Sequence, residues 1–594
     1  MNFSLLLAVL LCGVPLAVCG GETVPAPEQA ERLRRLLARV DGEPLAVFSV
    51  LDARATLDRL ARTAAGRAFA DPQYAPQRRE AYRLLEEVLG AHPEALWDAL
   101  RPHVAGPMAL VWTGDGAGRK PEVRDGGAAD GPALRCRLFV AVRDRGSIEA
   151  VQLGWPQIPP DSDALLGGLS LELCPLEQLA SNPPAPEWAD RCARMIGEMQ
   201  WVLRPGASRT LLAPEEARTP AWVKALKALG LLDVERIEWN VLPLERYFVE
   251  ELRCELKPEA RSLLARLLLS LRPDPQSWEA LERALPGGHE VQLLLQTDLK
   301  AMGDGFPVLM RFFERMLRGK RWTGLHGDSE DALAPDRFGF LTRPWAGTFG
   351  LLGKSGESGE TQLIGVAAEP GTKSGERRRQ LLEGLAGIGL DFETSARAPT
   401  IGGQPPLAAG FKGRGIMPAP MIGLSDGWIW LCSSTAAYHE LVAALAEQRH
   451  LGKDRRAAFV PDPVDRPGIP FPEKSVFELR VNLPGVGPLA YTSWMLGEGG
   501  PQLFGWKVPS GLLPSPGFLK KHLVPYVVAG VRTGFEVRFH ARGPAPGGAL
   551  VPFAVLAALS EEMRRMEASG PEALRRELEA LTGQGPETGR GDDR

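Results

Sequence analysis

Two stretches of the chain alternate apolar and polar residues and then continue into an Ala/Leu-rich helix pattern. Residues 234–271 contain an alternating segment at 237–241 and end in EARSLLARLLLSL. Residues 527–566 contain the alternating FEVRFHAR and end in PFAVLAALSEEMRRM. A period of two predicts strands with one buried face, and leucines at helical spacing predict a helix packed on that face. The strand–strand–helix order is therefore expected to close two halves of the chain.

The same patterns predict further elements along both halves. Strands are expected at 45–51, 107–113, 138–142, 289–297, 337–353, 362–368, 428–432 and 476–483. Helices are expected at 27–40, 55–66, 77–92, 215–229, 308–319, 376–387 and 435–448. We predict an α+β fold of two related units, about 40–275 and 286–566, each an antiparallel sheet covered on one face by helices. Coincidence remains the alternative to duplication, because β-β-α units are common.

The pattern changes phase within the segment RYFVEELRCEL. Tyr247 and Val249 would share one face, whereas Leu252 and Cys254 would need a one-residue shift to join them. Such a shift predicts a β-bulge at Glu250-Glu251. This acidic pair, like the others in the chain, is expected on a solvated face rather than in general acid–base catalysis.

The N-terminus resembles an export signal. The apolar run from Phe3 to Leu11 has the length of a signal-peptide core and is too short to span a bilayer, so residues 1–20 are predicted to be a signal peptide. Leu16-Ala17-Val18-Cys19 is similar to a lipoprotein lipobox, with Val18 at the position that usually holds a smaller residue. Cys19 is therefore a candidate for lipidation, and simple cleavage is the alternative. The expected location is periplasmic or at the cell surface, with membrane contact only through the signal or this anchor.

Composition narrows the classes of function. The chain has 594 residues, of which 44% are hydrophobic and 24% charged, as in ordinary globular proteins, and the polar residues 567–594 are expected to form a helix end and a disordered tail. The formal net charge of −4 argues against nucleic-acid binding. Five cysteines follow the signal; Cys174 and Cys192 flank a proline-rich loop and are the candidates for a disulfide, whereas the others are expected to be buried thiols.

Motif searches find no catalytic, cofactor or metal site in a suitable context. GTFGLLGKS lacks the first glycine of a phosphate-binding loop at the required spacing. A nucleophile elbow follows a strand, whereas GLSDG (423–427) precedes one. Ser433, Ser434, Tyr438 and His439 lie together after a strand, where the serines are expected to cap a helix. The histidines lack the spacing of a local zinc site.

Tryptophans provide one further candidate. Trp428 and Trp430 would lie on one face of a predicted strand. They are expected in the core, and the alternative is the lining of an apolar pocket.

SDGWIWLCSST (425–435) combines an Asp-Gly turn, a strand and a Ser/Thr helix start. In this motif and in its order of elements, the chain resembles a class of uncharacterised bacterial exported proteins built from duplicated α+β units. The resemblance implies a periplasmic or surface location and no known catalytic residues.

These observations favour an exported, non-enzymatic protein that binds another envelope component or a second copy of itself. Two alternatives stay open. One is a carrier of an apolar ligand in a groove between sheet and leucine-rich helices, and the other is an enzyme whose site is assembled from distant residues.

Overall fold

The computed structural model describes most of the chain between residues 26 and 553. The described residues are 26–114, 134–157, 169–179, 185–194, 197–211, 221–228, 230–298, 347–355, 361–368, 379, 382–383, 392–401, 403–409, 421–425, 427–447, 472, 475–495, 502–503, 506–507 and 513–553. The predicted signal peptide, the predicted helix at 308–319 and the predicted tail lie outside them.

The strands of the main sheet come from both halves of the sequence. They are β1 (Ala46–Val50), β2 (Val104–Gly114), β3 (Leu134–Val142), β4 (Leu169–Pro175), β5 (Met199–Leu203), β6 (Val234–Pro243), β7 (Phe248–Leu256), β8 (Val291–Gln296), β9 (Thr348–Ser355), β10 (Thr361–Ala368), β11 (Phe392–Thr394), β12 (Leu407–Ala409), β13 (Met421–Ser425), β14 (Trp428–Cys432), β15 (Phe477–Val481), β18 (Tyr526–Thr533) and β19 (Glu536–Gly543). A small separate hairpin pairs β16 (Gln502–Leu503) with β17 (Trp506–Lys507).

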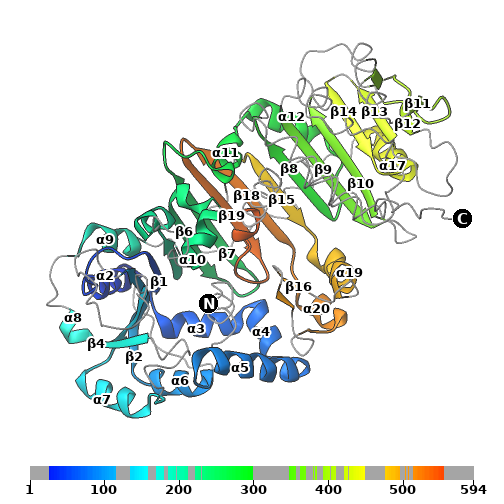
Figure 1. Cartoon of the computed structure of the whole chain (residues 1–594). Coiled ribbons are helices and arrows are strands. Elements are labelled where there is room, and N and C mark those ends of the chain that lie inside the picture. Colours follow the sequence, from blue (N-terminus) through cyan, green and yellow to red (C-terminus); the bar gives the residue numbers. More distant parts are fainter. Residues whose placement is uncertain are drawn as a thin grey trace, which may run out of the picture.

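Helices surround this sheet (Figure 1). They are α2 (Ala26–Leu37), α3 (Ala53–Arg62), α4 (Ala64–Ala70), α5 (Ala75–Leu89), α6 (Pro93–Leu100), α7 (Arg145–Gly154), α8 (Leu176–Leu179), α9 (Glu187–Ala193), α10 (Ala221–Ala228), α11 (Leu263–Ser270), α12 (Pro275–Ala284), α17 (Thr435–Ala446), α19 (Leu483–Met495) and α20 (Pro516–His522). Short 3₁₀ turns lie at Pro72–Tyr74, Pro205–Leu211 and Leu231–Asp233. Among the described residues, no helix is both long and apolar enough to cross a membrane.

The strands form one continuous sheet of 17 strands. In the first half the spatial order is β4-β3-β2-β1-β5-β6-β7. In the second half it is β14-β10-β9-β8-β15-β18-β19, with β13, β12 and β11 beyond β14. All neighbours are antiparallel except β3 and β4. The expected α+β class is confirmed.

The two halves also place corresponding elements alike. Strand β1 pairs with β5 from Ala46↔Leu203 to Val50↔Met199, and β8 pairs with β15 from Val291↔Val481 to Leu295↔Phe477. A helix precedes each first strand, α2 before β1 and α12 before β8. The halves differ at one end, because β4 is parallel to β3 whereas β14 is antiparallel to β10. This order supports duplication, which stays a prediction.

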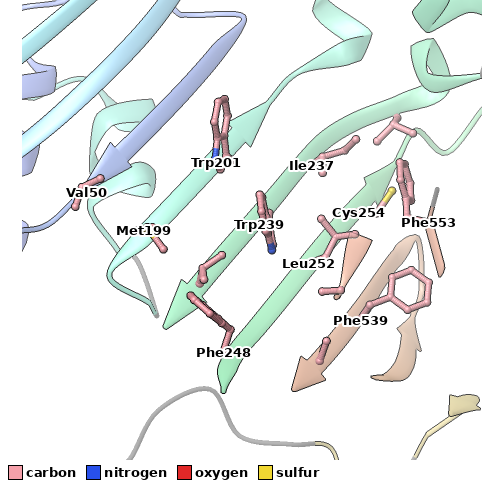
Figure 2. Close-up of a cluster of buried hydrophobic side chains, with 14 of the residues drawn as sticks. Val50, Met199, Trp201, Ile237, Trp239, Phe248, Leu252, Cys254, Phe539 and Phe553 are labelled. Carbon is pink, nitrogen blue, oxygen red and sulfur yellow. The ribbon is translucent and has the colours of Figure 1, made fainter. Parts of the chain in front are cut away.

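The halves join along β7 and β19, which pair antiparallel from Phe248↔Gly543 to Glu255↔Glu536. We call this strand pair the seam. One large apolar core extends across one face of it, which we call the front face. Trp239, Leu252 and Phe539 lie side by side in that core, from β6, β7 and β19 (Figure 2). The seam is therefore an internal part of the fold and not a surface contact between separate lobes.

Helices pack against both faces of the sheet, whereas the pattern predicts one covered face. Helices α3, α6, α7 and α11 contribute to the front-face core. On the opposite face, which we call the back face, α2, α8 and α9 pack over β1–β5, and α12 and α17 pack over β8–β10 and β14. Strands buried on both faces have fewer polar positions, which explains apolar runs such as LFVAV in β3.

The predicted bulge at Glu250-Glu251 is wrong. Strand β7 keeps its register through both residues, and the irregularity of this hairpin lies in β6, between Val234 and Arg236. Glu250 occupies a front-face position in line with Phe248 and Leu252, so a buried carboxylate breaks the apolar pattern without changing the backbone phase. The predicted solvated face is also wrong, because Glu250 is 0% and Glu251 2% exposed.

Candidate binding site on the back face

A cavity of about 320 Å³ lies on the back face, over β1, β5, β6 and β7 and beside α9. Seven of its lining residues are acidic or basic: Glu43, Arg191, Arg204, Glu235, Arg236, Glu238 and Glu255. The remaining residues are Pro44, Ala46, Val47, Trp188, Cys192 and Val202. The cavity is thus lined by charges of both signs on a floor of β-strands.

The sheet register brings these side chains together. Val202 of β5 faces Glu238 of β6, and Arg236 of β6 faces Glu255 of β7. Directly paired residues point to the same side of a sheet, so these four side chains share the back face. They come from sequence-distant strands that are fixed by backbone hydrogen bonding, so the floor of the cavity is preformed.

Ion pairs hold most of these charges in place. Arg204 lies 2.9 Å from Glu43, measured from Nη1 to Oε1. Arg236 contacts two carboxylates, with Nε 3.0 Å from Glu238 and Nη2 3.3 Å from Glu255. Burial raises the pKa of Glu238, and Arg236 and Arg253 act in the opposite direction. Arg236 thus balances the charge of two carboxylates, those of Glu238 and Glu255, on the β6–β7 side of the cavity floor.

A row of buried polar residues crosses the sheet on the same face as the cavity. The row consists of four residues on neighbouring strands, each directly opposite the next: Gln200 of β5, Asn240 of β6, Glu251 of β7 and His540 of β19. Their exposed fractions are 2%, 1%, 2% and 6%. We call these four residues the polar row. It crosses the seam and links the two halves on the back face.

Two members of the polar row form a weak pair. His540 Nδ1 lies 3.6 Å from Glu251 Oε2, and Glu251 also pairs with Arg253. Burial lowers the pKa of His540, while Glu251 raises it. The imidazole is therefore mainly neutral at pH 7, and the distance to Glu251 is longer than a hydrogen bond.

On the front face, Glu250 accepts four hydrogen bonds. They come from Trp239 Nε1 at 2.7 Å and from the backbone N–H groups of Gly547 (3.0 Å), Gly548 (2.9 Å) and Ala549 (3.4 Å). Burial raises the pKa of Glu250 to about 7, although these donors favour the charged form. The carboxylate fastens the segment after β19 to β7 and has a structural role.

The two candidate cysteines that the structure describes are buried thiols. Cys19 lies outside the described residues. Cys174 of β4 and Cys192 of α9 are both free thiols, buried in the same apolar cluster between the sheet and its back-face helices. Burial raises the pKa of Cys174 to about 11 and of Cys192 to about 12. Their disulfide stays a prediction.

The motifs that were interpreted as structural occupy structural positions. Ser434 caps α17 by accepting a hydrogen bond from the N–H of Ala437 at 3.1 Å. Tyr438 is buried and donates to the carbonyl of Pro399 at 2.9 Å. Lys354 lies within β9 and pairs with Glu440 at 2.5 Å, so GLLGKS is part of a strand and does not form a phosphate-binding loop.

Trp430 is 2% exposed and belongs to the core beneath α17, as expected. Trp428 packs at the edge of the same cluster, and the two ring centroids are 6.4 Å apart. Both tryptophans therefore fill a core rather than line the cavity.

Sequence reasoning missed the residues of the cavity and of the polar row. Gln200, Val202 and Arg204 lie in or just after β5, a five-residue strand that was not predicted. Glu238 and Asn240 were assigned to the polar side of a half-buried strand, yet both are buried. No local signal distinguishes a solvated polar face from one that lines a cavity.

Within the part of the chain that the structure describes, no group of three or more His, Cys, Asp or Glu residues could hold a metal ion. The chain matches no protein-family model, and no curated protein or solved structure is significantly similar to it.

Proposed function

We propose that the protein is an exported, non-enzymatic binding protein whose back-face cavity takes a small charged ligand. The cavity of about 320 Å³ with three arginines and four glutamates in its lining is the observation that supports this proposal. Its volume is at the lower end of the range of ligand pockets, about 300–1,000 Å³. A ligand of few heavy atoms that makes charge-assisted hydrogen bonds suits such a space.

Catalysis is less well supported than binding at this site. The cavity has one cysteine in its lining and no histidine. A thiol with a pKa of about 12 carries almost no thiolate at neutral pH, so Cys192 is a poor nucleophile. The ionisable groups that remain are arginines and glutamates engaged in ion pairs, which suit recognition.

The apolar-carrier alternative also finds less support here. Pockets for apolar ligands are lined mainly by hydrophobic and aromatic side chains. This lining is dominated by charges, and the leucines of α11 face the front-face core instead.

We expect replacement of Arg204 by glutamine to weaken ligand binding at least tenfold, since a hydrogen bond to a charged group contributes on the order of 1.5–3 kcal/mol. Isothermal titration would measure binding of single probes: glycine, lysine, ε-aminocaproate, hexanoate and glucose. Arg145→Gln is the matched control, because Arg145 is 76% exposed on α7. Absence of binding of every charged probe to the wild-type chain at millimolar concentration would contradict the proposed function.

Export makes a separate prediction. The signal-peptide pattern at residues 1–20 implies that the mature chain starts between about residues 18 and 24. N-terminal sequencing of the protein from its native cell measures this directly. An abundant form that retains Met1 contradicts the export part of the proposal and leaves the cavity unaffected.

A further inference from the structure

Two members of the polar row have amide oxygens without a hydrogen-bond partner. They are Gln200 Oε1 and Asn240 Oδ1, and both side chains are almost completely buried. Buried polar atoms in folded proteins nearly always have partners, so adjacent exceptions require an explanation. Both atoms are acceptors, so the missing partner is a hydrogen-bond donor.

The position of these acceptors connects them to the cavity. Gln200 and Asn240 face each other across β5 and β6. Each lies two residues from a residue that lines the cavity, Val202 and Glu238 respectively. Two residues along an antiparallel strand span about 7 Å, and all four side chains share the back face. The acceptors therefore lie on the same face as the cavity floor, one side-chain position further along β5 and β6.

The charges that face this region favour a cation. Glu238 and Glu255 share Arg236, whereas Glu251 is paired with Arg253. From β19, Arg538 pairs with Glu536, and His540 is mainly neutral. The negative charge of Glu238, two residues from Asn240 on β6, is thus only partly compensated by the shared Arg236. A positively charged donor would balance the rest of this charge.

We propose that Glu238, Asn240 and Gln200 bind the ammonium group of a ligand whose carboxylate is held by Arg204 in the cavity. The inference rests on the proposed function and specifies its ligand class: an amino acid or short peptide whose ammonium lies several bonds from its carboxylate. Lysine and ε-aminocaproate have this separation, whereas glycine does not.

Isothermal titration with single probes tests the assignment. ε-Aminocaproate is expected to bind at least tenfold more tightly than hexanoate, which lacks the ammonium, and than glycine, in which the two charges are adjacent. Equal affinity for ε-aminocaproate and hexanoate would overturn the ammonium site and leave the proposed function standing. Failure of all charged probes would instead overturn the proposed function.

The variant Asn240→Leu removes the unpartnered oxygen at similar volume. It is expected to lower the affinity for ε-aminocaproate at least tenfold and to leave the affinity for hexanoate unchanged. Gln292→Leu is the matched control, because Gln292 Oε1 is also buried without a partner but lies on β8, across the seam. Loss of ε-aminocaproate binding in the control, or unchanged binding in Asn240→Leu, contradicts the proposal. Thermal melting of both variants verifies that each chain is folded, and Gln200→Met gives a second test if Asn240→Leu does not fold.

Discussion

At about pH 5, replacement of Glu250 by alanine is expected to lower the free energy of unfolding by about 3–5 kcal/mol. The carboxylate accepts hydrogen bonds from Trp239 Nε1 and from three backbone N–H groups at residues 547–549. Alanine leaves these donors without an acceptor inside the protein, and each buried unsatisfied group costs about 1–3 kcal/mol. Urea unfolding followed by tryptophan fluorescence measures the change.

Glutamate-to-glutamine replacement at the same position separates this effect from loss of side-chain volume. Glu250→Gln keeps an oxygen that accepts part of the hydrogen bonds, so its loss of stability is expected to be clearly smaller than that of Glu250→Ala. A loss below about 1 kcal/mol in Glu250→Ala would show that Glu250 does not fasten the segment after β19 to β7.

Stability is also expected to depend on pH through Glu250. Burial raises its pKa from 4.5 to about 7 in the folded chain. The folded state therefore holds this proton more tightly than the unfolded state, and its stabilising contribution is complete below pH 4.5 and is lost as the pH rises through 7. The expected loss over this window is about 3 kcal/mol, since one pKa unit corresponds to about 1.4 kcal/mol.

Other buried groups titrate in the same range, so the measurement compares wild type with Glu250→Gln at each pH. The free energy of unfolding of wild type, relative to the variant, is expected to fall between pH 4.5 and 8. A difference that is constant with pH would mean that Glu250 has an ordinary pKa in the folded chain.

Alternation of apolar and polar residues predicts most strands of the sheet correctly. Strands β6, β15 and β19 lie where the two-residue period places them, and α17 begins at its predicted serine cap. Strands β4, β5, β11, β12 and β13 of the main sheet were missed, and all of these except β4 have five residues or fewer. Such short segments show hardly more than two periods, and their neighbours in the sheet, not their own residues, stabilise them as strands.

The candidate site depends on contacts that local patterns do not contain. Glu250 interrupts an apolar face, and sequence alone favours a bulge over a buried carboxylate whose donors come from residues 547–549. Glu238 and Asn240 alternate like solvated residues, yet pairing with β5 and β7 and the packing of α9 enclose that side of the sheet. Burial of a polar residue is thus a property of the assembled sheet, which one sequence does not encode locally.

The seam between β7 and β19 determines when the sheet can be completed during synthesis and folding of the chain. Phe248 of β7 finds its neighbour Gly543 only after β19, almost 300 residues later in the chain, has been made. Until then, β7 is an edge strand of the N-terminal half with unpaired backbone N–H and C=O groups. Such an edge can pair with strands of other chains and promote aggregation. Contacts this distant in sequence form slowly. Pairing of β7 with β19, rather than folding of either half, is therefore the slow folding step and the one most prone to aggregation.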